Sequence, residues 1–149
     1  MKVLLTQSDR NIGARDVDQN LLKVFTKEFE QQNDVKDLLH NPKTKLKFLE
    51  EIEKARLKLT SNDDIDISID SLAADCDFER TIDRTELESI NKDVKEGIIN
   101  LLRESLAELG GTVTIDKIEM VGEATRMPFV QSAVEAVFKG KTVQRTLNT

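Results

Sequence analysis

The stretch that most constrains how this chain can fold is the octapeptide at residues 121–128, Val-Gly-Glu-Ala-Thr-Arg-Met-Pro. A mainly apolar run at residues 118–121 leads into it and is typical of a strand, and apolar residues at helical spacing follow it. Gly122 allows a sharp turn of the backbone, Thr125 can cap the following helix, and Pro128 suits the first turn of that helix. The sequence therefore predicts that a strand, a tight turn and a helix start meet here.

Two interpretations of this junction are open. A helix N-terminus presents free N–H groups and a partial positive charge, which suit a phosphate or another anion. Arg126 would stand beside it with a planar guanidinium that can stack on a purine. The alternative is an ordinary turn between a strand and a helix, and the local pattern by itself does not decide between them.

The spacing of apolar residues predicts four helices, which cover residues 15–32, 42–59, 84–109 and 128–138. Asn41 and Pro42 are suited to cap and start the second helix, and Asp83 with Glu86 has the pattern of a capping box for the third. Gly97 lies in the middle of the third apolar stripe and indicates a kink or a split into two helices.

Alternating side chains predict a β-hairpin. Residues 65–70 alternate strictly between isoleucine and acidic or hydroxyl side chains, and residues 76–82 alternate again, which is typical of strands with one buried face. We expect an antiparallel pair with a longer connection at residues 71–75. The side chains expected to pack against the helices are Ile65, Ile67, Ile69, Phe78 and Ile82. Short strands are also expected at residues 3–5 and from Val143, so the fold class is predicted to be α+β.

Composition excludes several classes of function. The chain of 149 residues makes one domain or a piece of a larger one. The net charge of −6 argues against nucleic acid as a partner, because its phosphates repel an acidic surface. No apolar stretch approaches the roughly 20 residues that a membrane span needs, and Cys76, the only cysteine, fits a reducing compartment. We therefore expect a cytoplasmic protein with no membrane or nucleic-acid partner.

No catalytic or metal-binding set can be assembled from the sequence. His40 is the only histidine and has no second histidine or cysteine near it in the chain. Cys76 is open to two interpretations, a reactive thiol or a small, partly buried apolar residue. The acidic stretch at residues 63–66 lacks the spacing and the glycine of a calcium loop, so it fits a solvated strand face better. We expect no catalytic residue and no metal site.

The octapeptide resembles the second nucleotide motif of the seventy-kilodalton heat-shock chaperones, usually Val-Gly-Gly-Ser/Ala-Thr-Arg-Ile-Pro. Four other stretches resemble that family in order and spacing: residues 8–18, residues 41–43 with 53–61, the strand segments 66–72 and 77–78, and residues 140–141 with 146–148. Arg15, Ala124 and the Thr-Leu-Asn segment that ends at Asn148 favour the large, 110-kilodalton branch, whose members act as nucleotide exchange factors and substrate holders.

The resemblance implies part of an actin-like ATPase (ribonuclease H-like) second lobe, with helices packed on a β-hairpin sheet. Residues 15–111 would form the peripheral subdomain, and residues 1–14 and 112–149 would be pieces of the inner subdomain. The family's first phosphate loop, catalytic lysine and metal-ligating aspartates would lie before Met1, and its Asp-Glu-Ala segment would lie after Thr149. This chain by itself is therefore expected not to be an enzyme.

The resemblance also implies an adenine-nucleotide site. The residues that would contact the nucleotide are Gly122, Ala124, Arg126, Met127, Glu53, Arg56, Thr60 and Gly13. Three positions depart from the family pattern. Glu123 and Ala14 each replace the second glycine of a turn, and Glu123 adds a carboxylate near the phosphate side. Leu57 stands where the family usually has a cation over the adenine ring. Loss of that cation weakens binding by on the order of 0.5–2 kcal/mol. We expect ATP or ADP to bind weakly or not at all.

Three functions remain open, and we favour the first. In the first, the chain is a chaperone module that contacts the ATPase domain of another, seventy-kilodalton chaperone in a nucleotide-exchange role. In the second, it is an adenine-nucleotide-binding lobe that is inactive without its missing half. In the third, it is an unrelated acidic scaffold. An unrelated function loses ground because chance similarity would not preserve five motifs in their order. Acidic side chains near the hairpin suit a basic partner surface, or alternatively keep an edge hairpin soluble. These acids are Asp63, Asp64, Asp66, Asp70, Asp75, Asp77 and Glu79.

Overall fold

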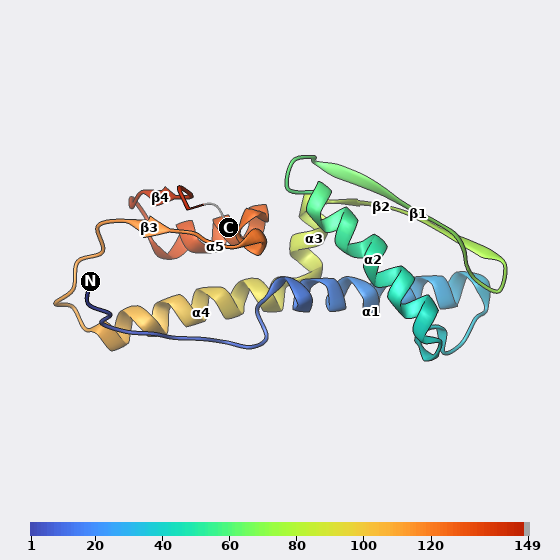
Figure 1. Ribbon diagram of the computed structural model, residues 1–149, viewed down its shortest axis with the longest axis horizontal. Coiled ribbons are helices and arrows are strands. Elements are labelled where there is room, and N and C mark those ends of the chain that lie inside the picture. The colour runs from blue at the N-terminus through green and yellow to red at the C-terminus, as the bar shows by residue number, and fades with distance from the viewer. Residues whose placement is uncertain (148–149) are drawn as a thin grey trace. The chain divides into compact units, whose positions relative to one another are not determined.

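The computed structural model describes residues 1–147 (Figure 1). The chain divides into two compact units. The hairpin unit is Ala14–Asn91, and the pocket unit combines Met1–Gly13 with the chain from Lys92 onward. The predicted Thr-Leu-Asn segment ends at Asn148, which lies outside the described residues.

The hairpin unit contains helices on one face of an antiparallel hairpin (Figure 1). Its elements in chain order are α1 (Ala14–Asn33), the 3₁₀ helix η1 (Leu38–His40), α2 (Pro42–Lys58), β1 (Asp64–Ala73), β2 (Cys76–Asp83) and α3 (Arg84–Ile90). Asn41 caps α2 by accepting from the backbone N–H of Lys43, and Asp83 caps α3 by accepting from the N–H of Glu86. The predicted helices at 15–32 and 42–59 are confirmed.

Aromatic packing forms the centre of the hairpin unit. The ring of Phe78 lies 5.6 Å from Phe25, 6.3 Å from Phe29 and 4.9 Å from Phe48, measured between centroids. The apolar face of the hairpin is buried as predicted at Ile67, Ile69, Phe78 and Ile82, whereas Ile65 at its outer end is only half-buried. This face fixes the register of the hairpin, because a slip by one residue would turn its acids inward.

The predicted long connection at residues 71–75 is wrong. β1 continues to Ala73, and a two-residue turn of Ala74 and Asp75 leads into β2. Both turn residues have positive φ, 51° and 56°, as a type I′ hairpin turn requires. A register irregularity after Ile69 interrupts the alternation, and the N–H of Ser71 donates to Oδ1 of Asp77 over 2.7 Å. Because the irregularity breaks the alternation of side chains, the sequence pattern does not show that the strand continues.

The pocket unit contains one long helix, one short helix and a small parallel sheet (Figure 1). Its elements in chain order are α4 (Lys92–Leu109), β3 (Ile118–Glu119), the 3₁₀ helix η2 (Glu123–Arg126), α5 (Pro128–Val137) and β4 (Val143–Gln144). Ile118 pairs with Val143, and Glu119 pairs with Gln144. The strands predicted at 118–121 and from Val143 are confirmed, although each is short, and so is the helix at 128–138.

The strand predicted at residues 3–5 is wrong. This segment forms no strand, and Val3 and Leu4 are 67% and 58% exposed. Its backbone has no strand beside it within the described residues, so an apolar run that suits a buried strand lacks the partner that a strand requires.

The predicted helix at 84–109 is split, but at Asn91 and not near Gly97. The side chain of Asn91 is fully buried, donates to the carbonyl of Leu87 over 2.9 Å and accepts from the side chain of Asn20 over 3.0 Å. Gly97 lies within the unbroken α4, where an added Cβ would come within 2.7 Å of Cγ2 of Ile12. The glycine therefore serves close packing of the N-terminal segment and does not break the helix.

The predicted α+β class agrees with this mixture of helices and small sheets. The predicted peripheral subdomain extends to residue 111, whereas the hairpin unit ends at Asn91. The units are defined by packing, and the subdomain assignment stays a prediction. Of the helices in residues 1–147, none combines the length and the apolar character that crossing a membrane demands.

Candidate functional site

The octapeptide folds as a glycine turn, η2 and the start of α5. Gly122 has φ 104° and ψ 148°, a conformation that side chains with a Cβ rarely adopt, although a Cβ there would meet no atom within 4 Å. The predicted capping role of Thr125 is wrong, because η2 intervenes and Met127 precedes α5 without a side-chain cap. The hydroxyl of Thr125 instead donates to the carbonyl of Gly122 over 2.6 Å, which closes the turn.

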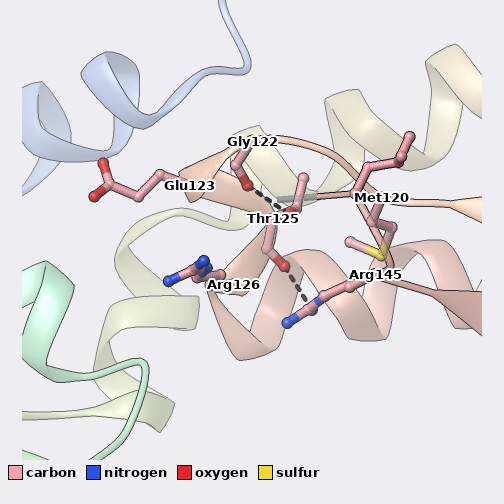
Figure 2. Close-up of a pocket in the computed structure, with 7 residues that line it drawn as sticks. Met120, Gly122, Glu123, Thr125, Arg126 and Arg145 are labelled. Carbon is pink, nitrogen blue, oxygen red and sulfur yellow. Dashed lines mark hydrogen bonds between the residues drawn. The ribbon is translucent and has the colours of Figure 1, made fainter. Parts of the chain in front are cut away.

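A pocket of about 320 Å³ opens beside this turn (Figure 2). It is lined by Met120, Gly122, Glu123, Thr125, Arg126, Arg145 and Leu147. Of the residues predicted to contact a nucleotide from the turn, Gly122 and Arg126 line the pocket. Ala124 and Met127 do not line it, and Met127 is only 1% exposed in the core of the unit. We call this cavity the Gly122 pocket.

Four lining residues were not predicted as site residues: Met120, Thr125, Arg145 and Leu147. Arg145 and Leu147 follow β4, and they reach the turn because β4 pairs in parallel with β3. The carboxyl ends of parallel strands lie at the same edge, so the residues after β4 come to lie beside those after β3. The signal in the sequence is the predicted strand at Val143, but the sequence pattern does not identify the strand before Gly122 as its partner.

Polar contacts fix the segment after β4. Nη2 of Arg145 donates to the carbonyl of Thr125 over 2.7 Å (Figure 2). The carboxylate of Glu119 accepts from the backbone N–H of Leu147 over 2.9 Å, and also from the N–H and, over 3.1 Å, the hydroxyl of Thr146. These bonds, chiefly the one from Leu147, lower the pKa of the Glu119 carboxyl below its ordinary value.

The charges of the pocket are mixed. Arg126 and Arg145 bring two guanidinium groups, and Glu123 brings one carboxylate. All three residues are exposed at the surface, and Figure 2 shows the Glu123 side chain extending away from Arg145. The pocket therefore carries a net charge of about +1 from these groups, since guanidinium and carboxylate are ionised at neutral pH.

The other half of the predicted nucleotide site lies in the hairpin unit, on α2 and the turn after it. Arg56 is 2% exposed, its Nε donates to Oδ1 of Asp18 over 2.7 Å, and its Nη1 is buried with no hydrogen-bond partner in residues 1–147. Glu53 is exposed and lies 3.9 Å from Nη2 of Arg56. The hydroxyl of Thr60 donates to the carbonyl of Leu57 over 2.7 Å. The strongest contact of Arg56 is therefore internal to the unit.

The turn at Gly13 and Ala14 lies where the two units divide in sequence. Gly13 is the last residue of the N-terminal part of the pocket unit, and Ala14 is the first residue of α1. The turn residues near Gly122 and the helix residues near Arg56 belong to different units, each with its own packing. The predicted assignment of all these residues to one nucleotide site stays a prediction.

The acidic side chains near the hairpin are all exposed. They are Asp63, Asp64, Asp66, Asp70, Asp75, Asp77 and Glu79. Among the described residues, only Asp63 of this set forms an ion pair, 3.4 Å from Arg84. Arg80 of β2 is bound to Glu86 and Glu28 instead, and these hydrogen bonds raise the pKa of its guanidinium. No group of three or more potential metal ligands occurs in residues 1–147.

Comparison of the sequence with known proteins shows which proteins it is similar to. The model described as "Hsp70 protein" matches residues 1–149. Heat shock protein 88 of Dictyostelium discoideum is 34% identical over 150 aligned residues, which cover 100% of this chain and 19% of that protein. A heat shock protein homolog of the yeast Lachancea kluyveri is 31% identical, with coverage of 99% and 21%.

A third relative carries a different name. Heat shock cognate 70 kDa protein 3 of Dictyostelium discoideum is 30% identical, with coverage of 99% of this chain and 23% of that protein. The chain thus spans about a fifth of the length of the curated relatives that it matches.

Proposed function

The chain belongs to the Hsp70 protein family, and from that premise we propose that it is part of a heat-shock-type chaperone that acts by contacting the ATPase domain of another chaperone. The predicted resemblance to this family is confirmed, and the yeast heat shock protein homologs among the relatives agree with the likeness to its large branch. A nucleotide-exchange role for this chain is the finer part of the proposal. Its location is proposed to be cytoplasmic.

The proposed architecture is the second lobe of an actin-like ATPase domain. Residues 15–111 form its peripheral subdomain in this proposal, and the remainder belongs to the inner subdomain. The family match along residues 1–149 supports it, as does a hairpin backed by helices in the part that would be peripheral. We propose that the chain alone does not hydrolyse ATP, because phosphoryl transfer needs positioned metal ions and no group of three or more potential metal ligands occurs in residues 1–147.

The observation that carries the partner proposal is the acidic outer face of the hairpin. We define the acidic hairpin face as Asp64, Asp66, Asp70, Asp77 and Glu79. These side chains alternate with the buried ones along β1 and β2 and are exposed. Charges of one sign on one face accelerate encounter with a basic surface and repel other acidic surfaces, and both effects weaken as salt rises.

A titration against a seventy-kilodalton chaperone ATPase domain tests this proposal. We expect binding at low salt that weakens at high salt, with faster ADP release from the partner. The variant Asp66→Asn, Asp77→Asn, Glu79→Gln should bind more weakly. The matched control is Glu50→Gln, Glu96→Gln, Glu104→Gln, which removes the same charge from exposed helix positions. No complex at low salt, with unchanged ADP release at saturating chain, would reject the proposal.

A second candidate function is an adenine-nucleotide-binding lobe that is inactive without the rest of an ATPase domain. The Gly122 pocket favours it, because it places two arginines beside the turn that the family resemblance assigns to nucleotide. A thermal shift with ADP distinguishes the two functions, since a ligand that binds only the native state raises its stability. Glu123→Gly combined with Leu57→Arg should strengthen ADP binding, and a folded double variant without any gain would remove this explanation of weak affinity.

A further inference from the structure

The segment Arg145, Thr146 and Leu147, which we call the latch, is held at two points, one on the Gly122 turn and one on β3. Arg145 donates to the carbonyl of Thr125, and Glu119 of β3 accepts from the backbone of Thr146 and Leu147. The latch supplies two of the seven residues that line the pocket. One wall of the pocket therefore comes from residues that follow the turn by some 20 positions in the chain.

We propose that Arg145 is a binding residue of the Gly122 pocket for the anionic part of a phosphate-bearing adenine ligand, and that Glu119 is the positioning residue that holds it there. This inference rests on the nucleotide-binding candidate function and adds a residue to it. The resemblance to the family assigned no role to either residue.

The chemistry of Arg145 suits this role. A guanidinium has five N–H donors in a fixed plane, and one of them is used in the bond to Thr125. That bond restrains a side chain whose rotamer entropy would otherwise have to be lost on binding, so the remaining donors are partly pre-oriented. Without Arg145, the charges of Arg126 and Glu123 would cancel, and the pocket would offer no net attraction to an anion.

Glu119 acts through the latch and does not line the pocket. Its carboxylate accepts from two consecutive backbone N–H groups and from the hydroxyl of Thr146. Charge-assisted hydrogen bonds of this kind are stronger than neutral ones. Removal of the carboxylate should therefore free residues 145–147 and leave the turn itself closed by its own bond between Thr125 and Gly122.

The first experiment is an NMR titration of the 149-residue chain with ADP and with adenosine. We expect millimolar ADP to shift the amide signals of the turn and the latch, and adenosine to bind about two- to fivefold more weakly. Arg145→Gln should abolish the preference for ADP and leave adenosine binding unchanged. Arg103→Gln, an exposed arginine on α4 in the same unit, is the matched control.

The second experiment separates positioning from general structure. Amide exchange at Thr146 and Leu147 should be fastest in Glu119→Ala, intermediate in Glu119→Gln and slowest in the unmodified chain, and the preference for ADP over adenosine should follow the same order. Glu135→Gln, an exposed carboxylate on α5, should change neither measurement.

The outcomes are distinct. ADP binding that is equal in the unmodified chain and Arg145→Gln overturns the role of Arg145 and leaves the nucleotide-binding function standing. Absence of any shift with either ligand overturns both, without bearing on contact with a chaperone ATPase domain. An equal loss of ADP and adenosine binding in Glu119→Ala shows a structural role only and overturns the positioning role.

Discussion

The hairpin unit and the pocket unit achieve order by contrasting means. In the hairpin unit, the rings of Phe25, Phe29 and Phe48 surround Phe78, and a buried arginine is paired across two helices. In the pocket unit, β3 and β4 pair over two residues each, and the wall of the Gly122 pocket is held by polar contacts at the surface. The more deeply packed region therefore offers a rigid surface, whereas the candidate ligand pocket can change shape at small cost in free energy.

Truncation of the central ring should show the largest difference between the units. Phe78→Ala removes a 4% exposed side chain that contacts three other rings, so we expect a loss of about 3–5 kcal/mol in the free energy of unfolding. Phe138→Ala, at a half-buried position of the pocket unit, should cost clearly less. Urea unfolding followed by circular dichroism measures both. Equal losses would remove the contrast in packing.

Loss of the buried ion pair should have the next largest effect. Asp18→Ala leaves the guanidinium of Arg56 buried without its carboxylate, which should cost roughly 3 kcal/mol. The double variant Asp18→Leu, Arg56→Met should recover most of that loss, because no buried charge is left unpaired. Glu51→Ala, which breaks an exposed pair with Lys54, serves as the control and should change little. A double variant as unstable as the single one would contradict this account.

Close packing at Gly97 offers a smaller test inside the pocket unit. In Gly97→Ala, the new Cβ would overlap Cγ2 of Ile12, and the gain in helix propensity offsets part of the strain, so we expect a net loss of about 1 kcal/mol. Ile12→Ala in the same chain should relieve the overlap. Gly111→Ala meets no atom within 4 Å and should be neutral or slightly stabilising. Thermal unfolding ranks the three variants, and a loss in Gly111→Ala as large as in Gly97→Ala would point to a general intolerance of substitution.

The smallest expected effect is a pH dependence of the latch. The pKa of Glu119 is lowered in the folded chain, chiefly by the N–H of Leu147. The stabilisation of the latch by the ionised Glu119 carboxylate is therefore fully present above the ordinary carboxyl pKa. It is lost as pH falls through the lowered pKa of the folded state. Amide exchange at Leu147, measured between about pH 6 and pH 3 and corrected for intrinsic rates, should show loss of protection toward acid. In Glu119→Gln, the same profile should be flat.

The sequence was informative wherever a long pattern carried the structure. The alternation at residues 65–70 predicted which hairpin side chains are buried, because the side-chain period of a strand is two. The cap at Asn41 and the start of α2 at Pro42 followed from the chemistry of unsatisfied backbone N–H groups. The tight turn at Ala74 and Asp75 was missed because neither residue is the glycine or asparagine that usually signals positive φ.

The candidate site was only half predictable for a physical reason. Gly122 and Arg126 were identified because they lie within one local motif. Arg145 and Leu147 reach the pocket through a parallel pairing of two-residue strands, and a strand of that length carries no periodicity from which to infer its partner. The helix break at Asn91 was likewise missed, since its cause is a buried contact with Asn20, 71 positions away in the chain.

The contact between Asn20 and Asn91 also has a consequence for chain architecture. The hairpin unit interrupts the pocket unit in sequence, so it is an insertion with one entry, near Ala14, and one exit, at Asn91. The hydrogen bond of 3.0 Å from the side-chain amide of Asn20 to that of Asn91 ties the first turns of α1 to the end of α3, which brings the two ends of the insertion together within their own unit. Residues 14–91 are thus suited to expression as a separate module and to circular permutation through a short linker between these ends.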